Sequence, residues 1–138
     1  MTIKSFRHVG IVTSNIDASI SFYDDLGFSV YWDQNETSDF INTILGEEIE
    51  YIRTVKMTNG DFNIELLDFK RENSVDNFTI TSQNITHISV DTEDIDKLYL
   101  KYSQLFKSKP QLTNDRKAKV AFMKDPNNNM FIEIVEMV

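Results

Sequence analysis

The feature that most constrains the fold of this chain is an internal repeat. HVGIVTSNID, which begins at His8, aligns with HISVDTEDID, which begins at His87, a shift of 87 − 8 = 79 residues. NGDFNIELL, from Asn59, aligns with NNNMFIEIV, from Asn127, a shift of 127 − 59 = 68. Two matches in the same order indicate a duplicated supersecondary unit. The first half then carries 79 − 68 = 11 extra residues.

Each half is predicted to fold as a strand, a helix and further strands. Apolar spacing predicts a strand over 5–13 and a helix over about 16–26, and the equivalent helix over about 93–105. Two later strands flank Asn59-Gly60, a typical two-residue hairpin turn. Turn residues over 125–129 have the same place in the second half. The prediction is an α+β chain of two βαβββ modules.

Length and composition limit the domain organisation and the partners. A chain of 138 residues suits one domain over 1–138, with module one at about 1–69, a linker at about 70–84 and module two at about 85–138. The net charge of −8, without a dense basic cluster, argues against nucleic-acid binding. No apolar stretch is long enough to span a membrane, so we expect a cytoplasmic protein.

Four polar residues interrupt apolar strands at repeat-related positions: His8, Glu65, His87 and Glu133. Side chains alternate across a strand, so these four take the face opposite their apolar neighbours, which pack on the helices. Each alone is more often a solvent-facing residue, but the chain has only two histidines and both are repeat-equivalent. The chain has no cysteine, so a metal must be held by nitrogen and oxygen.

Together these residues form a set of two imidazoles and two carboxylates. Such a set neutralises a divalent cation and leaves two positions for water or a bidentate substrate. Zinc, nickel, cobalt, manganese and ferrous iron all accept it. We therefore predict one divalent ion whose identity the sequence leaves open.

Other residues are expected to line a pocket around this ion. A turn at Asn59-Gly60 sets Thr54 opposite Glu65, and the second hairpin sets Phe122 opposite Glu133. Trp32 and Phe40 are further candidates, although core packing or dimer contact explains such aromatics equally well. Two rim lysines could attract an anionic substrate or simply be solvated: Lys56 and Lys124.

The extra residues of the first half predict a short helix between Ser38 and Gly46. Phe40, Ile41, Ile44 and Leu45 recur at helical spacing and form one apolar stripe. We expect this helix to cover the pocket as a lid. The alternative is that the stripe packs against a dimer partner.

Four segments resemble the vicinal oxygen chelate superfamily, which includes glyoxalase I, extradiol dioxygenases and fosfomycin or bleomycin resistance proteins. They are HVGIVTSNIDASISFYDDLGF, NIELLDF, THISVDTEDID and KDPNNNMFIEIVE. The resemblance implies modules that curl into a cup-shaped, mostly antiparallel eight-stranded sheet around a metal, with the helices on the outer face. The metal-ligand pattern maps onto His8, Glu65, His87 and Glu133, and it looks most like that of glyoxalase I.

Departures from the family pattern limit the reaction. Val12 and Phe69 stand where glyoxalase I usually carries an arginine and an asparagine for glutathione. Asp115-Arg116-Lys117-Ala118 replaces a stretch typical of methylmalonyl-CoA epimerases. Extradiol dioxygenases leave open the position that Glu65 would occupy.

The resemblance implies a metal-dependent lyase or isomerase acting on a small substrate with two adjacent oxygens. Glu65 or Glu133 would be the general base. The alternatives are a non-catalytic protein that binds an antibiotic-like small molecule, and an extradiol-type dioxygenase. We also expect a homodimer.

Overall fold

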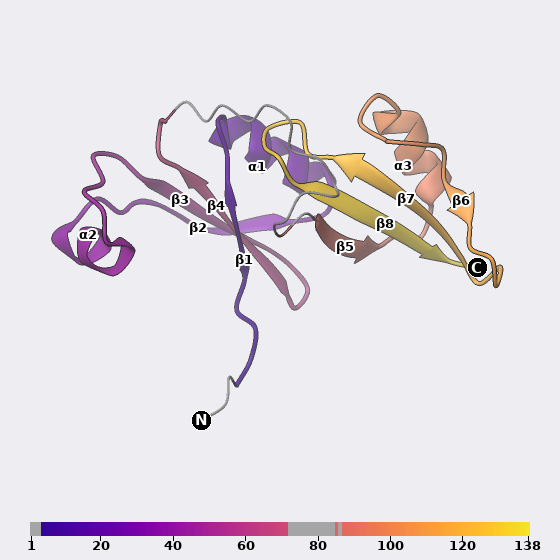
Figure 1. Ribbon diagram of the computed structural model, residues 1–138, viewed down its shortest axis with the longest axis horizontal. Coiled ribbons are helices and arrows are strands. Elements are labelled where there is room, and N and C mark those ends of the chain that lie inside the picture. The colour runs from indigo at the N-terminus through magenta and orange to yellow at the C-terminus, as the bar shows by residue number, and fades with distance from the viewer. Residues whose placement is uncertain (1–3, 72–84, 86) are drawn as a thin grey trace. The chain divides into compact units, whose positions relative to one another are not determined.

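The computed structural model describes residues 4–71, 85 and 87–138 (Figure 1). The chain divides into two compact units, residues 1–74 and 75–138, which we call the N-terminal and C-terminal modules. Most of the expected linker, residues 72–84, lies outside the described residues. Among the described residues, no helix has the length and apolar character needed to cross a membrane.

The N-terminal module is a four-stranded mixed sheet with two helices. Its strands are β1 (Val9–Val12), β2 (Ser29–Asn35), β3 (Arg53–Asn59) and β4 (Phe62–Asp68), and its helices are α1 (Ile16–Asp25) and α2 (Asp39–Leu45). The strand order is β1-β4-β3-β2. β1 is parallel to β4, and the other neighbours are antiparallel.

The C-terminal module repeats this topology without a counterpart of α2 in its described residues. Its elements are β5 (His87–Asp91), α3 (Ile95–Tyr102), β6 (Gln111–Leu112), β7 (Ala118–Lys124) and β8 (Phe131–Met137). The strand order is β5-β8-β7-β6, with one parallel pair, β5 and β8. The predicted α+β class, the βαβββ modules and the mainly antiparallel pairing are confirmed. The strands form two four-stranded sheets.

The main helix of each module begins with the same local arrangement. The Asn15 side chain accepts a hydrogen bond from the Ala18 N–H at 3.1 Å. The Asp94 side chain, 79 residues later, accepts one from the Lys97 N–H at 2.9 Å. The hydroxyls of Thr13 and Thr92 accept from the N–H of these caps. The repeated TSN and TED segments therefore specify the same turn into a helix.

α3 ends at Tyr102, three residues before the predicted end. The Leu105 N–H donates to the Tyr102 carbonyl at 2.8 Å, which tightens the chain into a turn. The buried Phe106 then forms a bridge with Met123 of β7. Pairing with the sheet therefore ends the helix earlier than its apolar spacing predicts.

Each sheet buries one face against its own helix. In the N-terminal module, α1 packs against β4 and β2, and the residues of the covered face are fully buried: Val55, Met57, Ile64 and Leu66. In the C-terminal module, α3 packs against β8, where Ile132 and Ile134 are fully buried. Because side chains alternate, Glu65 and Glu133 point to the other face.

Strand register confirms the repeat residue by residue. Gly10 pairs with Glu65 in the N-terminal sheet, and Ser89 pairs with Glu133 in the C-terminal sheet. Gly10 and Ser89 each lie two residues after a histidine. Each module therefore presents one His and one Glu at the same place on the face away from its helix.

The hairpin between β3 and β4 turns one residue later than predicted. Asn59 pairs with Phe62, so the turn residues are Gly60 and Asp61. Gly60 has a φ of 59°, whereas Asp61 is not among the residues with positive φ. One positive φ at the first turn position is the pattern of a type II′ turn, which Gly favours there, rather than the type I′ turn expected for Asn-Gly.

The short helix predicted from the extra residues is present as α2. The Ser38 hydroxyl accepts from the N–H of Ile41 at 3.2 Å, and Gly46 ends the helix with a φ of 68°. Paired residues locate the insertion, because Gln34 pairs with Thr54 whereas Gln111 pairs with Val120. The offset between the modules falls from 111 − 34 = 77 to 120 − 54 = 66, so the 11 residues lie between β2 and β3.

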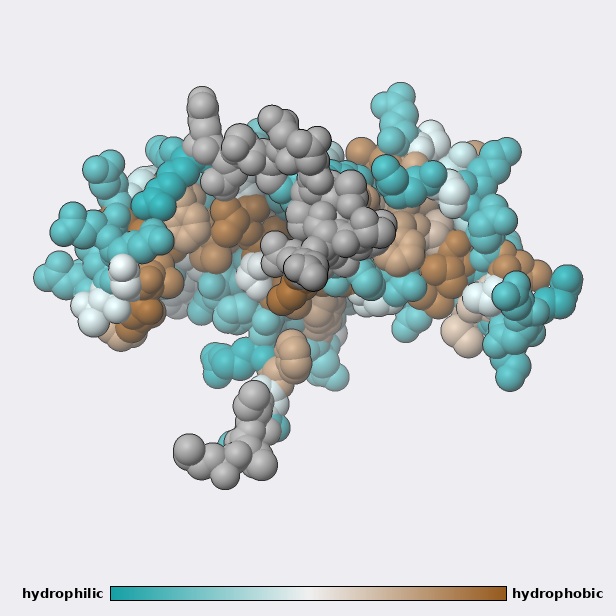
Figure 2. All heavy atoms as spheres, in the orientation of Figure 1, coloured by the Kyte–Doolittle hydropathy of each residue, from teal (hydrophilic) through white to brown (hydrophobic). Residues whose placement is uncertain are grey.

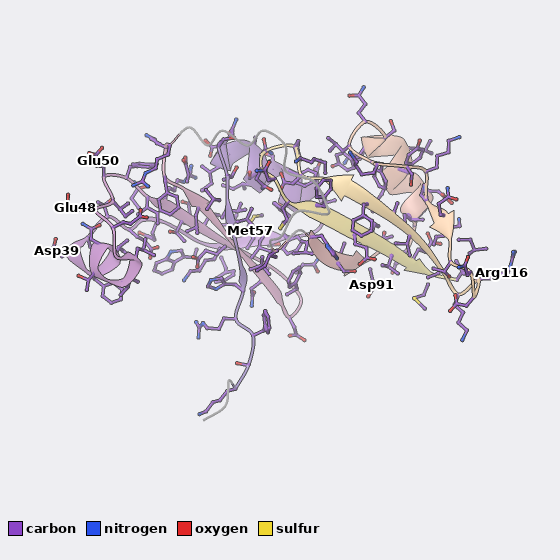
Figure 3. The ribbon with its side chains drawn as sticks, in the orientation of Figure 1. Asp39, Glu48, Glu50, Met57, Asp91 and Arg116 are labelled. Carbon is purple, nitrogen blue, oxygen red and sulfur yellow. The ribbon has the colours of Figure 1, made fainter. Side chains whose placement is uncertain are left out.

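The apolar stripe of α2, expected to cover the pocket or a dimer partner, is exposed in this chain. Phe40 is 68% exposed and Ile44 is 59% exposed, and apolar spheres reach the surface at this end of the module (Figure 2). Asp39, Glu48 and Glu50 lie around the same end (Figure 3). The N-terminal module therefore carries an apolar ridge with acidic surroundings.

Candidate functional site

The predicted ligands of the N-terminal module lie in contact. Glu65 projects from the middle of β4, and His8 immediately precedes β1, the strand parallel to it. The Nε2 atom of His8 lies 3.5 Å from the Oε2 atom of Glu65. The side chains are 36% and 18% exposed, so both remain reachable from solvent.

This spacing fits two donors to one metal ion. Bonds of about 2.1 Å to nitrogen and oxygen place neighbouring donors about 3.0 Å apart at octahedral angles and about 3.4 Å apart at tetrahedral angles. The observed 3.5 Å is close to these values. A carboxylate and an imidazole on a half-exposed face are also ligands that divalent metals accept. The N-terminal pair therefore fits half of the predicted site.

The register places Lys56 opposite Glu65, so the prediction that Thr54 has this place is wrong. The error follows from the position of the turn. A turn placed one residue later along the chain changes the cross-strand partner of every residue in the hairpin by two positions. Thr54 instead pairs with Leu67, although it remains on the Glu65 face. On the far side of β3, Lys56 pairs with Trp32 of β2.

Lys56 and Trp32 contact each other. The Nζ atom of Lys56 lies 5.0 Å from the centre of the Trp32 ring, a cation–π distance. Trp32 is 41% exposed, so the predicted pocket residue does reach the surface. Sequence reasoning named both residues but not their contact, because their cross-strand pairing depends on the register.

Thr54 is fully buried, and its hydroxyl oxygen has no hydrogen-bond partner within the described part of the chain. Buried hydroxyl groups are normally hydrogen-bonded, so an unpaired one requires an explanation. Thr54 lies two residues from Lys56 along β3 and therefore shares its face. No sequence signal distinguishes this threonine from a strand residue that fills space.

In the C-terminal module, the predicted pairing of Phe122 with Glu133 is confirmed. His87 is the first residue of β5, and its ring meets the Phe122 ring edge-on with 5.2 Å between centres. His87, Phe122 and Glu133 thus lie on one face of this sheet. Neither module by itself, over its described residues, brings together three or more His, Asp or Glu side chains able to hold a metal ion.

The other aromatic side chains of these strands and of α2 are less closely connected to these pairs. Phe40 lies on α2 and Tyr31, 55% exposed, lies on β2, whereas Phe131 is buried under Lys124, whose Nζ atom is 5.0 Å from its ring centre. A hollow of about 650 Å³ is lined by none of the predicted site residues. Its lining is Glu48, Glu50, Tyr51, Phe69, Lys70 and Arg71.

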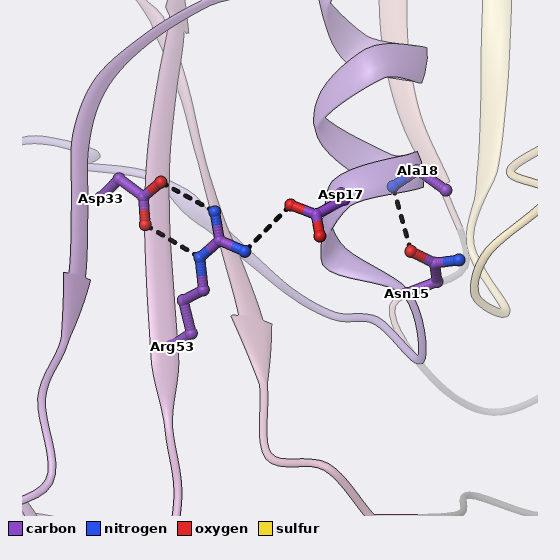
Figure 4. A network of polar contacts seen from close by, with 5 residues as sticks. All are labelled: Asn15, Asp17, Ala18, Asp33 and Arg53. Atoms are coloured by element: carbon purple, nitrogen blue, oxygen red, sulfur yellow. Dashed lines mark hydrogen bonds and ion pairs between the residues drawn. The ribbon is translucent and has the colours of Figure 1, made fainter.

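A charged network supports the helix side of the N-terminal sheet (Figure 4). Arg53 of β3 donates two hydrogen bonds to Asp33 of β2, at 3.0 and 2.8 Å, and a third to Asp17 of α1, at 2.9 Å. The hydrogen bonds from Arg53 lower the pKa of Asp33, and Asp33 and Asp17 raise the pKa of Arg53. The network ties the start of α1 to two strands, on the face opposite Glu65.

The sequence profile of the Glyoxalase/Bleomycin resistance protein/Dioxygenase superfamily matches residues 5–132. The chain belongs to this superfamily. The resemblance of the four segments is thereby confirmed. A sequence comparison with curated proteins finds no significant match.

Solved structures of superfamily proteins share the fold. A glyoxalase family protein from Bacillus cereus has a TM-score of 0.86 at 15% identity, over 100% of this chain and 97% of its own. The fosfomycin resistance protein FosX from Listeria monocytogenes, complexed with Mn(II) and sulfate, has a TM-score of 0.65 at 11% identity, over 99% and 94%. A bleomycin-binding protein complexed with bleomycin has a TM-score of 0.56 at 12% identity, over 98% and 100%.

Proposed function

We propose that this superfamily member is a divalent-metal-dependent lyase or isomerase of the glyoxalase type, acting on a small substrate with two adjacent oxygen atoms. The metal ligands would be His8, Glu65, His87 and Glu133. The observation that carries the proposal is the equal register of the modules, Gly10 with Glu65 and Ser89 with Glu133. A duplicated His/Glu pair is what a site with four ligands from two modules requires.

Two further observations support a metal. The 3.5 Å contact between His8 and Glu65 matches the spacing of donors to one ion. The similar FosX structure contains Mn(II). The donor set accepts zinc, nickel, cobalt, manganese or iron, so the proposal names the charge of the ion and not the element.

The chain's own side chains would position the substrate and move a proton. A bound divalent ion would supply Lewis acidity to the substrate oxygens. Glu65 or Glu133 would accept a proton from the carbon beside a carbonyl group, the general-base role of a carboxylate. The contact with His8 holds the Glu65 carboxylate on the open face, where only part of its surface is hydrated.

Elemental analysis of the purified protein tests the site. We expect about one divalent ion per chain, as the single N2O2 set requires. His8→Ala and His87→Ala should each weaken metal binding strongly, and the double variant should lose it. Asp24→Asn, on α1, is the control carboxylate and should keep the metal. Full metal retention in the double histidine variant would exclude the proposed ligands.

The aromatic contact in the C-terminal module favours a second candidate, a binding protein without catalysis. The His87 ring packs edge-on against Phe122, so this histidine takes part in an aromatic surface. A similar structure is that of a protein complexed with bleomycin. Titration of metal-free protein with bleomycin, followed by tryptophan fluorescence, separates the candidates. Tight binding to metal-free protein that is unchanged by His8→Ala would favour the binding protein.

A further inference from the structure

A row of side chains crosses the N-terminal sheet beside the His8–Glu65 contact. Gly10, Glu65, Lys56 and Trp32 are successive cross-strand partners on β1, β4, β3 and β2. Cross-strand partners share a face, at intervals of about 5 Å. The row therefore begins at the proposed metal ligands and ends at an exposed indole ring.

Lys56 has a defined position in this row without an ion-pair partner. It lies directly opposite Glu65, yet the Glu65 carboxylate contacts His8, and the Lys56 ammonium lies over the Trp32 ring instead. Among the described residues, Lys56 makes no ion pair with any carboxylate. An aromatic face attracts a cation without neutralising it. The site therefore presents a positive charge that remains available to a ligand.

Thr54 adds a hydrogen-bonding group to the same face. Its side chain is only 1% exposed, and its hydroxyl lacks a partner within the described part of the chain. Lys56 is the next residue of β3 on that face, and Gln34 of β2 is the cross-strand neighbour of Thr54. A hydroxyl left unpaired in a folded protein is accounted for when a ligand oxygen completes its hydrogen bonding.

We propose that Lys56, Thr54 and the face of Trp32 form a subsite for an anionic group of the substrate, a carboxylate or a phosphate. This inference rests on the proposed function, because the substrate would place its adjacent oxygens at the His/Glu ligands and its acidic group one strand further along the row. The substrate class is therefore a small molecule with two adjacent oxygens and one anionic group further along. The exposed indole ring would contact the apolar part of the molecule.

Two small acids of similar size test this subsite, and the Lys56 variant then separates it from chelation by the second carboxylate. Malate and 2-hydroxybutyrate share a carboxylate and an adjacent hydroxyl, but only malate carries a second carboxylate. Trp32 is the only tryptophan of the chain, so its fluorescence reports binding beside Lys56. With Mn(II)-loaded protein, we expect malate to bind at least about tenfold more tightly than 2-hydroxybutyrate.

Substitutions assign that preference to residues. Lys56→Met should remove the preference for malate while leaving Mn(II) affinity intact, and Thr54→Val should weaken malate binding by about threefold to tenfold. The matched control is Lys124→Met, because Lys124 also lies 5.0 Å from an aromatic ring centre but belongs to the other module. It should keep the preference.

The outcomes distinguish this subsite from the metal site. Equal binding of the two acids, or a preference that survives Lys56→Met, contradicts the subsite while the metal site stands. If the protein binds none of the five candidate divalent ions, the proposed function fails, and inorganic phosphate titrated into metal-free protein decides the subsite. A fluorescence change with phosphate that Lys56→Met removes supports it, and no change in the wild type refutes it.

Discussion

The two modules share one scaffold but differ in the side chains around their His/Glu positions. Cross-strand pairing makes Lys56 the equivalent of Phe122, since they lie opposite Glu65 and Glu133. Two residues further along, buried Thr54 corresponds to Val120. The N-terminal face is therefore cationic and polar, and the C-terminal face is apolar and aromatic. Within this repeat, the positions next to the proposed ligands have diverged while the His and Glu are the same in both halves.

On the helix side of the sheets, by contrast, the two modules have kept an equivalent contact. Asp17 and Asp96 occupy equivalent positions in α1 and α3, and each contacts the equivalent basic residue, Arg53 at 2.9 Å and Lys119 at 2.6 Å. Arg53 also binds Asp33. The tie between helix and strand is thus common to both modules, and in the N-terminal module it extends to a second strand.

Truncation of equivalent core residues tests whether the modules unfold together. Ile64→Ala and Ile132→Ala, at fully buried positions 68 residues apart, should each lower the free energy of unfolding by about 2–5 kcal/mol. If the chain is one domain, Ile132→Ala shifts the urea midpoint of Trp32 fluorescence as far as that of circular dichroism. Leu100→Ala, at an exposed position on α3, is the control and should change little. An unchanged Trp32 transition in Ile132→Ala would show independent modules.

Substitution of the two glutamates compares the proposed half-sites. Glu65→Gln and Glu133→Gln should each weaken Mn(II) binding by at least about 10–100-fold, the cost of disturbing groups that only support metal ligands. We expect similar losses, measured by calorimetric titration, because the two carboxylates have equivalent registers. A loss confined to one variant would contradict a site shared equally between the modules.

Removal of the helix ties should affect the N-terminal module more. Arg53→Met should cost about 1 kcal/mol after allowance for solvent screening, because it removes contacts to two elements. Lys119→Met removes one exposed contact and should cost less. Chemical unfolding measures both, and equal costs would contradict the difference in strength.

The effect of Arg53→Met should depend on pH in one direction. Arg53 holds the pKa of Asp33 below its usual value near 3.8. A carboxyl group whose pKa is lowered on folding stabilises the protein above its unfolded pKa, and this contribution is lost as the pH falls through the folded pKa. The stability gap between wild type and Arg53→Met should therefore be constant near neutral pH and narrow below about pH 4.

The smallest effect on stability is expected at α2. Phe40→Ala with Ile44→Ala removes only exposed apolar surface and should change the unfolding free energy by less than about 0.5 kcal/mol. If α2 is a lid, this variant should bind ligand more weakly than the wild type while its metal content persists. Light scattering, which measures the oligomeric state, tests the alternative interpretation. A fall from dimer to monomer with unchanged ligand binding would make the ridge a dimer contact.

The sequence predicted the topology well because the relevant signals are local or repeated. Ser38 and Gly46 bound α2 as expected, since a hydroxyl N-cap and a left-handed glycine act within one helical turn. The repeat predicted which strands carry His and Glu, and the observed registers agree. Membership of the superfamily also followed from local motifs.

The register of the first hairpin could not be predicted from the sequence. The Asn59-Gly60-Asp61 segment permits turns at either of two neighbouring positions, and both keep Thr54 and Glu65 on one face. Only the observed pairing of Asn59 with Phe62 distinguishes them. For this reason the contact of Lys56 with Trp32 and the unpaired hydroxyl of Thr54 emerged from the structure alone.

The parallel pairing of β1 with β4 also affects the order of folding. Val9 pairs with Ile64, so β1 cannot join its sheet until at least 64 − 9 = 55 further residues have been synthesised. Contacts so distant in sequence form late, because the intervening chain must first be ordered. His8 immediately precedes this strand, so its place beside Glu65 depends on the same pairing. His8 and Glu65 would therefore come together to bind a metal only after the β3–β4 hairpin has formed. Metal binding by this pair would require a folded N-terminal module.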